Sequence, residues 1–133
     1  MADKYTEKCV PFAELTLTEL YEVLRLRHQV FVMDQKCFFM DADRNDQMAY
    51  HYMLFAEDGS LAGYTRLFDV DNPYPGYLSI GRVVTHPEHR NKKCGQLLMT
   101  NSIIKIKELF GNHPIKIGAQ GYLKGFYASL GFN

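Results

Sequence analysis

The sequence predicts an α/β (α+β) fold in which a mixed, mainly antiparallel sheet is flanked by helices. Short β-branched or aromatic runs and amphipathic runs follow one another in the order strand, helix, three strands, helix, strand, helix. Three strands joined by short turns form an antiparallel meander, and a strand–helix–strand crossover makes its two strands parallel. The chain has 133 residues, 47% of them hydrophobic, which suits one core and a single domain over residues 1–133.

The first strand and the first helix are predicted between Lys8 and about Val32. Residues 8–15 suit a short edge strand, because Pro11 has no N–H for a central ladder. Thr16 and Glu19 have the spacing of a capping box. The apolar face behind them has helical spacing and consists of Leu17, Leu20, Tyr21, Leu24, His28 and Phe31.

An acidic segment follows, and we interpret it as a solvated loop. A calcium site is the alternative, because Asp41, Asp43 and Asn45 match the first three ligand positions of an EF-hand. That match fails further on, where Asp46 replaces the glycine and Tyr52 replaces the bidentate glutamate.

The remaining strands are separated by clear turn signals. Strands are predicted over Tyr50–Ala56 and Leu61–Val70, with an Asp-Gly hairpin turn between them, and over Tyr77–Thr85 after a Pro/Gly-rich turn. A helix follows Gly95 and ends at Gly111. The last elements are a short strand over residues 115–119 and a helix over residues 122–130.

A basic turn connects the fourth strand to the helix after it. Arg90, Lys92 and Lys93 precede Gly95, where the helix begins. A helix N-terminus offers unpaired N–H groups and the positive end of the dipole, so this turn is a candidate site for a phosphate or pyrophosphate. A solvated charged turn is the alternative. It is not a P-loop, because Gln96 follows the glycine.

Charge and cysteine content narrow the class of function. Fifteen basic residues balance fifteen acidic ones, which disfavours broad nucleic-acid binding. Cys9, Cys37 and Cys94 form no Cys-x-x-Cys pair, so we expect reduced thiols and a cytoplasmic location. No apolar run approaches a membrane span of about 18 residues, and His86 and His89 alone are too few ligands to predict a metal.

Two motifs resemble the GNAT superfamily of acyl-CoA-dependent N-acetyltransferases. The pyrophosphate-loop pattern Arg/Gln-x-x-Gly-x-Gly/Ala falls on Arg90-Asn91-Lys92-Lys93-Cys94-Gly95, after Val84-Thr85-His86-Pro87. The pattern Phe-Tyr-x-x-x-Gly-Phe falls on residues 126–132. The chain also resembles the ElaA-like group of that superfamily in residues 24–35, in Ile80–Val84 and in Ala119-Gln120.

This resemblance implies a GNAT-like fold and direct transfer of an acetyl group from acetyl-CoA to an amine of a small molecule or peptide, in a ternary complex and without a metal. The pantetheine arm would lie along a strand edge, and the pyrophosphate on the helix N-terminus. The implied cofactor-binding residues are Val83, Val84, Arg90, Asn91, Lys92, Lys93, Cys94, Gly95, Gln96, Leu97, Phe126 and Tyr127.

The chemistry of acetyl transfer assigns three candidate catalytic groups. The Val83 N–H would stabilise the oxyanion, and Tyr127, matched to the tyrosine of the superfamily's last helix, would protonate the leaving thiolate. A charged amine needs a base or a water chain, and His51 is one option beside a purely structural histidine. The carboxylates of Asp41, Asp43 and Asp46 could instead attract a cationic acceptor.

Two departures from the superfamily pattern leave a second function open. Lys93 replaces the usual first glycine of the loop, which would cost about 1 to 2 kcal/mol if that position has a positive φ. Relatives continue into closing strands, whereas this sequence ends at Asn133, so part of the acceptor pocket would be absent or supplied by another chain, as in a homodimer. The alternative function is a catalytically weak acyl-CoA-binding or regulatory module.

Overall fold

The computed structural model describes residues 4–36, 40–72, 74–90 and 93–117. Its strands are β1 (Thr6–Pro11), β2 (Tyr50–Phe55), β3 (Leu61–Phe68), β4 (Leu78–Thr85) and β5 (Ile115–Ile117). Its long helices are α1 (Leu17–Arg27) and α2 (Cys94–Phe110). The short helical segments are η1 (Phe12–Glu14), the π-helix η2 (His28–Asp34), η3 (Asp46–Met48) and η4 (Pro87–His89).

These elements confirm the predicted order as far as the fifth strand. The helix predicted over residues 122–130 lies outside the described residues. The first strand begins at Thr6 rather than Lys8 and ends at Pro11, because the chain turns there into η1. Its predicted place at a sheet edge is confirmed by the strand order β1-β2-β3-β4-β5.

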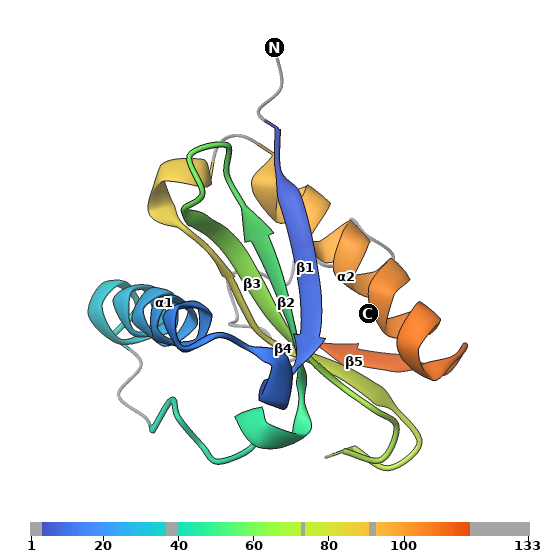
Figure 1. The fold of residues 1–133 in the computed structure, drawn as a ribbon. Helices are drawn as coiled ribbons and strands as arrows, with labels where there is room; N and C mark the ends of the chain where they lie inside the picture. The colour runs from blue at the N-terminus through green and yellow to red at the C-terminus, as the bar shows by residue number, and fades with distance from the viewer. Residues whose placement is uncertain (1–3, 37–39, 73, 91–92, 118–133) are drawn as a thin grey trace.

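The five strands form one mixed sheet (Figure 1). Neighbours from β1 to β4 pair antiparallel, which is the predicted meander. β5 pairs parallel with β4, as the β4–α2–β5 crossover requires.

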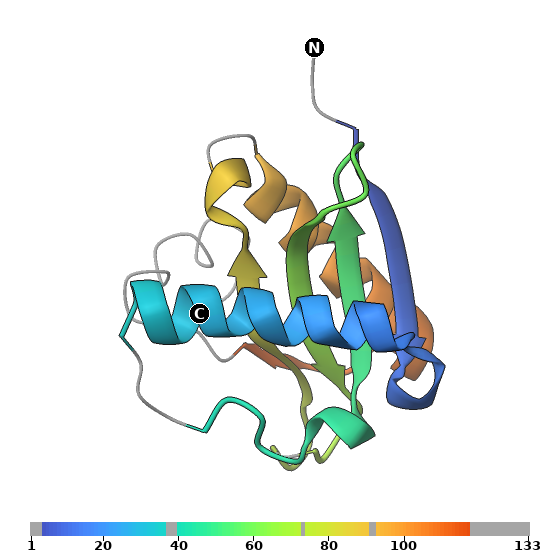
Figure 2. The same ribbon diagram turned by 60° about the vertical axis from the view of Figure 1, so that its left-hand side comes forward.

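The two long helices cover opposite faces of this sheet, as Figure 2 shows from the α1 side. Thr16 and Glu19 form the predicted capping box at the start of α1, with hydrogen bonds of 2.9 and 3.0 Å. The core under α1 consists of Val23, Leu26, Val30, Phe31, Met53, Leu61, Tyr64 and Val84. The core under α2 consists of Tyr52, Leu54, Ala62, Leu67, Leu78, Ile80, Cys94, Leu98, Met99 and Ile106.

Helix α2 packs closely on β3. A Cβ placed on Gly63 would lie 3.2 Å from both Cδ atoms of the buried Leu98, so glycine permits the close approach. The hydroxyls of Thr65 and Ser102 form a buried hydrogen bond of 2.7 Å along the same contact. These contacts fix α2, and its N-terminus follows the end of β4 through η4 and a short turn.

Candidate functional site

Strand β4 contains a bulge at the residues predicted to contact the cosubstrate. Val84 is paired with Tyr64 and Gly81 with Arg66, so two residues of β4 face the single residue between them on β3. Those two residues are Arg82 and Val83, and Arg82 has a positive φ of 49°. Such a bulge interrupts the hydrogen-bond ladder and re-aims nearby groups.

The bulge also changes which face of the sheet each valine contacts. Ile80 belongs to the core under α2, whereas Val84, four residues later, belongs to the core under α1. Regular alternation would place both on the same face. Because of the extra residue, Val83 packs on the α2 side and Val84 on the α1 side.

Within the described residues, β5 pairs with only part of the other edge of β4. Its parallel pairing with β5 extends from Leu78 to Ile80, and the described residues provide no β5 partner for Gly81–Thr85. Val83 therefore has no register partner on either side within the described part of the sheet. The predicted role of the Val83 N–H as an oxyanion donor stays a prediction.

The turn before α2 adopts the left-handed backbone that a glycine usually supplies. Lys93 is the N-cap residue, with φ 59° and ψ 13°, and its side chain makes no capping hydrogen bond. Its carbonyl accepts a hydrogen bond from the Leu97 N–H at 3.1 Å, which closes the first turn. The N–H groups at the start of such a helix have no intrahelical acceptor, and here the N-cap side chain does not cap them.

Cys94, the first residue of α2, is buried against β3. Its Sγ lies 3.9 Å from the carbonyl oxygen of Ala62. Burial raises the pKa of the Cys94 thiol, although a hydrogen bond with Tyr5 lowers it in part. The side chain is thus a protonated core group, which leaves its backbone N–H as the part able to face a ligand.

The other predicted binding residues are only partly described. Arg90 forms a long ion pair with Asp34, the last residue of η2, at 3.8 Å, and the two side chains are 45% and 44% exposed. Exposed pairs of this kind contribute little stability, so Arg90 can exchange its partner for a phosphate at little cost. Gln96 and Leu97 are exposed on the first turn of α2. Four predicted residues lie outside the described ranges: Asn91, Lys92, Phe126 and Tyr127.

His51 lies in β2, and its ring is completely buried. Its Nε2 lies 2.8 Å from the Asp46 carbonyl oxygen, and its Nδ1 lies 2.5 Å from the Tyr64 hydroxyl. Because a carbonyl can only accept, Nε2 carries the proton and Nδ1 accepts from Tyr64. Burial lowers the pKa of His51, and the imidazole is neutral. Its role as a base stays a prediction, and the lone pair it would use already holds a hydrogen bond.

The interpretation of the acidic segment as a solvated loop was wrong for its three aspartates. We call the group formed by Asp41, Asp43, Asp46, Arg27, Arg66 and Arg82 the Arg–Asp cluster. Each arginine comes from a different element, namely α1, β3 and β4. The three carboxylates are balanced by three guanidinium groups, so the cluster provides no net negative charge for attracting a cationic acceptor.

Burial alone would raise the pKa values of Asp43 and Asp46, but the arginines reverse the effect. The pKa of Asp43 is held well below its usual range by hydrogen bonds from Arg66 and from the Asn45 N–H and by the nearby charges. Hydrogen bonds and charges from Arg27 and Arg66 likewise lower the pKa of Asp46. Both groups are carboxylates at neutral pH.

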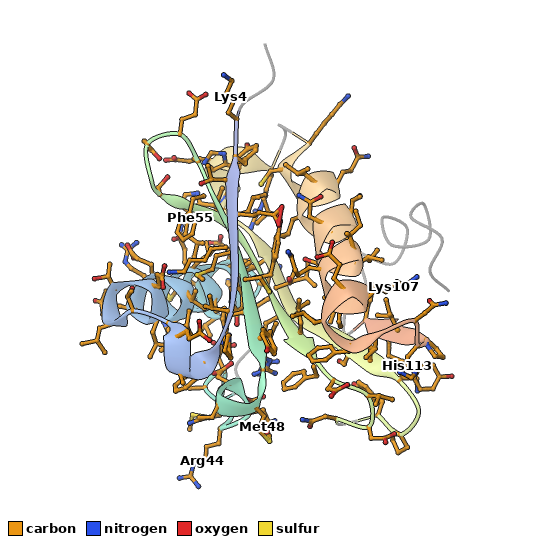
Figure 3. The ribbon with its side chains drawn as sticks, turned by 45° about the vertical axis from the view of Figure 1, so that its right-hand side comes forward. Lys4, Arg44, Met48, Phe55, Lys107 and His113 are labelled. Carbon is orange, nitrogen blue, oxygen red and sulfur yellow. The ribbon has the colours of Figure 1, made fainter. Side chains whose placement is uncertain are left out.

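The sequence contained one overlooked signal for this cluster. Arg27 lies four residues after Val23, and both are fully buried on the side of α1 that faces the core. The predicted apolar face was wrong for Leu17 and Tyr21, which are 87% and 69% exposed. A buried arginine needs a carboxylate partner, and the acidic segment is the next part of the chain. By contrast, Arg44 of the same segment is exposed, and Figure 3 shows it pointing away from the protein.

The described ranges contain neither a cluster of metal ligands nor a membrane-spanning helix. They contain no group of three or more His, Cys, Asp or Glu side chains that could hold a metal ion. No helix within them is long and apolar enough to cross a membrane.

Comparisons with known proteins agree with the fold and the family resemblance. Residues 22–133 match the family model of the acetyltransferase (GNAT) domain. The protein ElaA of Escherichia coli K12 is 33% identical over 121 residues, which are 90% of this chain and 78% of ElaA. An acyl-CoA N-acyltransferase from Pseudomonas aeruginosa superposes with a TM-score of 0.89 at 35% identity, covering 97% of this chain and 88% of that one. The E. coli ElaA structure gives a TM-score of 0.86 at 30% identity, over 96% and 86% of the chains.

Proposed function

Because this chain belongs to the GNAT acetyltransferase family, in its ElaA-like group, we propose that it transfers the acetyl group of acetyl-CoA to an amine of a small molecule or peptide. The family itself supports acyltransferase activity. The observation that carries the finer proposal is that β4, with its bulge at Arg82 and Val83, leads through η4 to the N-terminus of α2, where the N-cap side chain makes no capping hydrogen bond.

The two halves of this segment suit the two ends of the cosubstrate. The edge of β4 at Val83 and Val84 lies beyond the described pairing with β5, so its backbone can bond the amide groups of the pantetheine arm as an added strand would. The first N–H groups of α2 suit the pyrophosphate, with Arg90 and Lys93 as nearby cations.

The reaction then needs little covalent chemistry from the protein. The neutral amine attacks the thioester carbonyl, the new C–N bond forms, the C–S bond breaks, and the thiolate takes a proton. The Val83 N–H would stabilise the developing oxyanion, which is the largest single contribution expected from the protein. Tyr127 remains our candidate for protonating the thiolate, and His51 or a water chain for accepting the amine proton.

The described cysteines support direct transfer rather than an acylated enzyme. Burial raises the pKa of Cys9 to about 11, and the pKa of Cys94 is also raised by burial. A thiol acts as a nucleophile in its thiolate form, and neither environment favours that form at neutral pH.

A second candidate is a catalytically weak acyl-CoA-binding or regulatory module. The observation that favours it is Lys93, whose left-handed backbone carries a side chain where the superfamily pattern has glycine. That side chain is exposed at the N-terminus of α2 and can change how closely a pyrophosphate approaches the amides.

Calorimetry with acetyl-CoA, followed by thiol release with a panel of primary amines, separates the two candidates. We expect binding, together with thiol release that depends on the amine. Binding without turnover by any amine would support the regulatory module instead. Absence of binding would contradict both.

A further inference from the structure

The backbone of Arg82 is strained where it forms the β4 bulge. A φ of 49° is unusual for a residue with a side chain, because the Cβ then crowds the backbone. Such a conformation persists when the surrounding structure fixes it. The contacts of the Arg82 side chain show what fixes it here.

Arg82 is attached to the acidic segment at two carboxylates and one carbonyl. Its Nε lies 2.8 Å from Asp41 Oδ1, and its Nη2 lies 3.3 Å from Asp43 Oδ2. Nη2 also donates to the Asp41 carbonyl oxygen at 3.1 Å. Two nitrogen atoms of one planar guanidinium group therefore contact two carboxylates and a carbonyl, which a single lysine ammonium cannot reproduce.

The acidic segment is itself held rigidly by the other two arginines. Arg27, fully buried, contacts Asp41 Oδ2 at 2.9 Å and Asp46 Oδ1 at 2.8 Å. Arg66 binds both oxygens of Asp43, at 2.8 and 3.0 Å, and Asp46 Oδ1 at 2.9 Å. Asp41 thus bridges Arg27 and Arg82, and Asp43 bridges Arg66 and Arg82. Through these ion pairs, α1 and β3 are both connected to the bulge in β4.

We propose that Arg82 is a positioning residue for acetyl transfer, because its attachment to Asp41 and Asp43 holds the bulge and with it the Val83 backbone N–H. This inference rests on the proposed function. If the extra residue were redistributed along β4, neighbouring side chains would exchange faces, and the core contacts of Val83 and Val84 would be lost. The guanidinium of Arg82 stabilises the one arrangement that keeps Val83 at the edge of β4, beyond its described pairing with β5.

The substitution Arg82→Lys tests this idea, since it keeps the charge and removes the planar fork. Arg44→Lys is the matched control: Arg44 also has a positive φ, of 68°, but it is exposed. Three quantities are compared: the kcat of amine-dependent thiol release, the Kd for coenzyme A, and the amide proton exchange rate of Val83 by NMR.

We expect Arg82→Lys to lower kcat at least about tenfold, because a displaced oxyanion donor costs up to about 100- to 1000-fold. The Kd for coenzyme A should stay within about threefold, since the helix N-terminus is intact, and Val83 exchange should accelerate. Arg44→Lys should match the wild type in all three measurements. An unchanged kcat and unchanged Val83 exchange in Arg82→Lys would overturn the proposal, as would equal effects in both variants.

A second variant and the Val83 exchange rate distinguish failure of this proposal from failure of the proposed function. If Arg82→Lys does not fold, Asp43→Asn replaces it, and the same pattern is expected with smaller changes. If the wild type itself shows no amine-dependent turnover, the proposed function fails. Val83 exchange then still decides whether Arg82 holds the bulge, and an unchanged rate would contradict that too.

Discussion

The Tyr64 hydroxyl lies 2.5 Å from Nδ1 of His51, and both side chains are completely buried. Burial raises the pKa of Tyr64, so its hydroxyl stays protonated and donates a hydrogen bond to Nδ1 of His51. The hydrogen bond joins the neighbouring strands β2 and β3 beside the Arg–Asp cluster.

Removing this hydroxyl should destabilise the protein. Tyr64→Phe leaves the buried Nδ1 of His51 without a donor, which typically costs about 1 to 3 kcal/mol. Urea unfolding measures the difference. Tyr21→Phe is the control, because Tyr21 is 69% exposed, and its free energy of unfolding should equal that of the wild type. Equal stability of Tyr64→Phe and Tyr21→Phe would contradict the hydrogen-bond assignment.

Stability should decrease in two steps as the pH is lowered. Burial lowers the pKa of His51 in the folded protein. Its contribution to the free energy of unfolding is therefore complete above the pKa of histidine in the unfolded chain, about 6.5, and is lost as the pH falls below that value. The pKa values of Asp43 and Asp46 are lowered by their arginines despite burial, so their contribution is complete above about 4 and is lost below that pH. Urea unfolding from pH 8 to pH 3 tests the profile, and constant stability down to pH 4 would contradict the role of His51.

Lys93→Gly should increase stability by up to about 1 kcal/mol, because glycine adopts φ 59° without the cost that a Cβ brings. The greater freedom of glycine in the unfolded chain offsets part of the gain. Lys93→Ala is the control that removes the same amine but keeps the Cβ. A midpoint in urea for Lys93→Gly no higher than that of Lys93→Ala would show that the turn is not strained.

Tyr127→Phe tests the proton donor. We expect a lower kcat for thiol release and an unchanged affinity for acetyl-CoA, because the phenol hydroxyl would act on the leaving thiolate and not on the bound cosubstrate. Tyr122→Phe serves as the control, from the same C-terminal segment, and should keep the wild-type kcat. Unchanged turnover in Tyr127→Phe would remove the role from this residue.

Local signals made most of the fold predictable. The Thr16–Glu19 capping box and the edge position caused by Pro11 depend on neighbouring residues, and the structure confirms both. The strain at Lys93 was also predictable from a local signal. Lys93 occupies a motif position that usually holds glycine, which indicated the positive φ that the structure shows.

Long-range relationships were not predictable in the same way. The bulge at Arg82 arises from how β4 pairs with β3, and Ile80-Gly-Arg-Val-Val contains no alternation that marks it. The acidic segment resembled a solvated loop because its partners Arg27, Arg66 and Arg82 are distant in sequence or belong to other elements.

The most direct test of the account is a titration of the ¹⁵N-labelled protein with coenzyme A, followed by backbone amide NMR. We predict the largest shifts at Val83, at Val84 and at the first amides of α2, from Cys94 to Leu97, with little change in β1 on the far edge of the sheet. Shifts confined to other elements, or no shifts at all, would contradict the claim that this strand–turn–helix segment binds the cosubstrate.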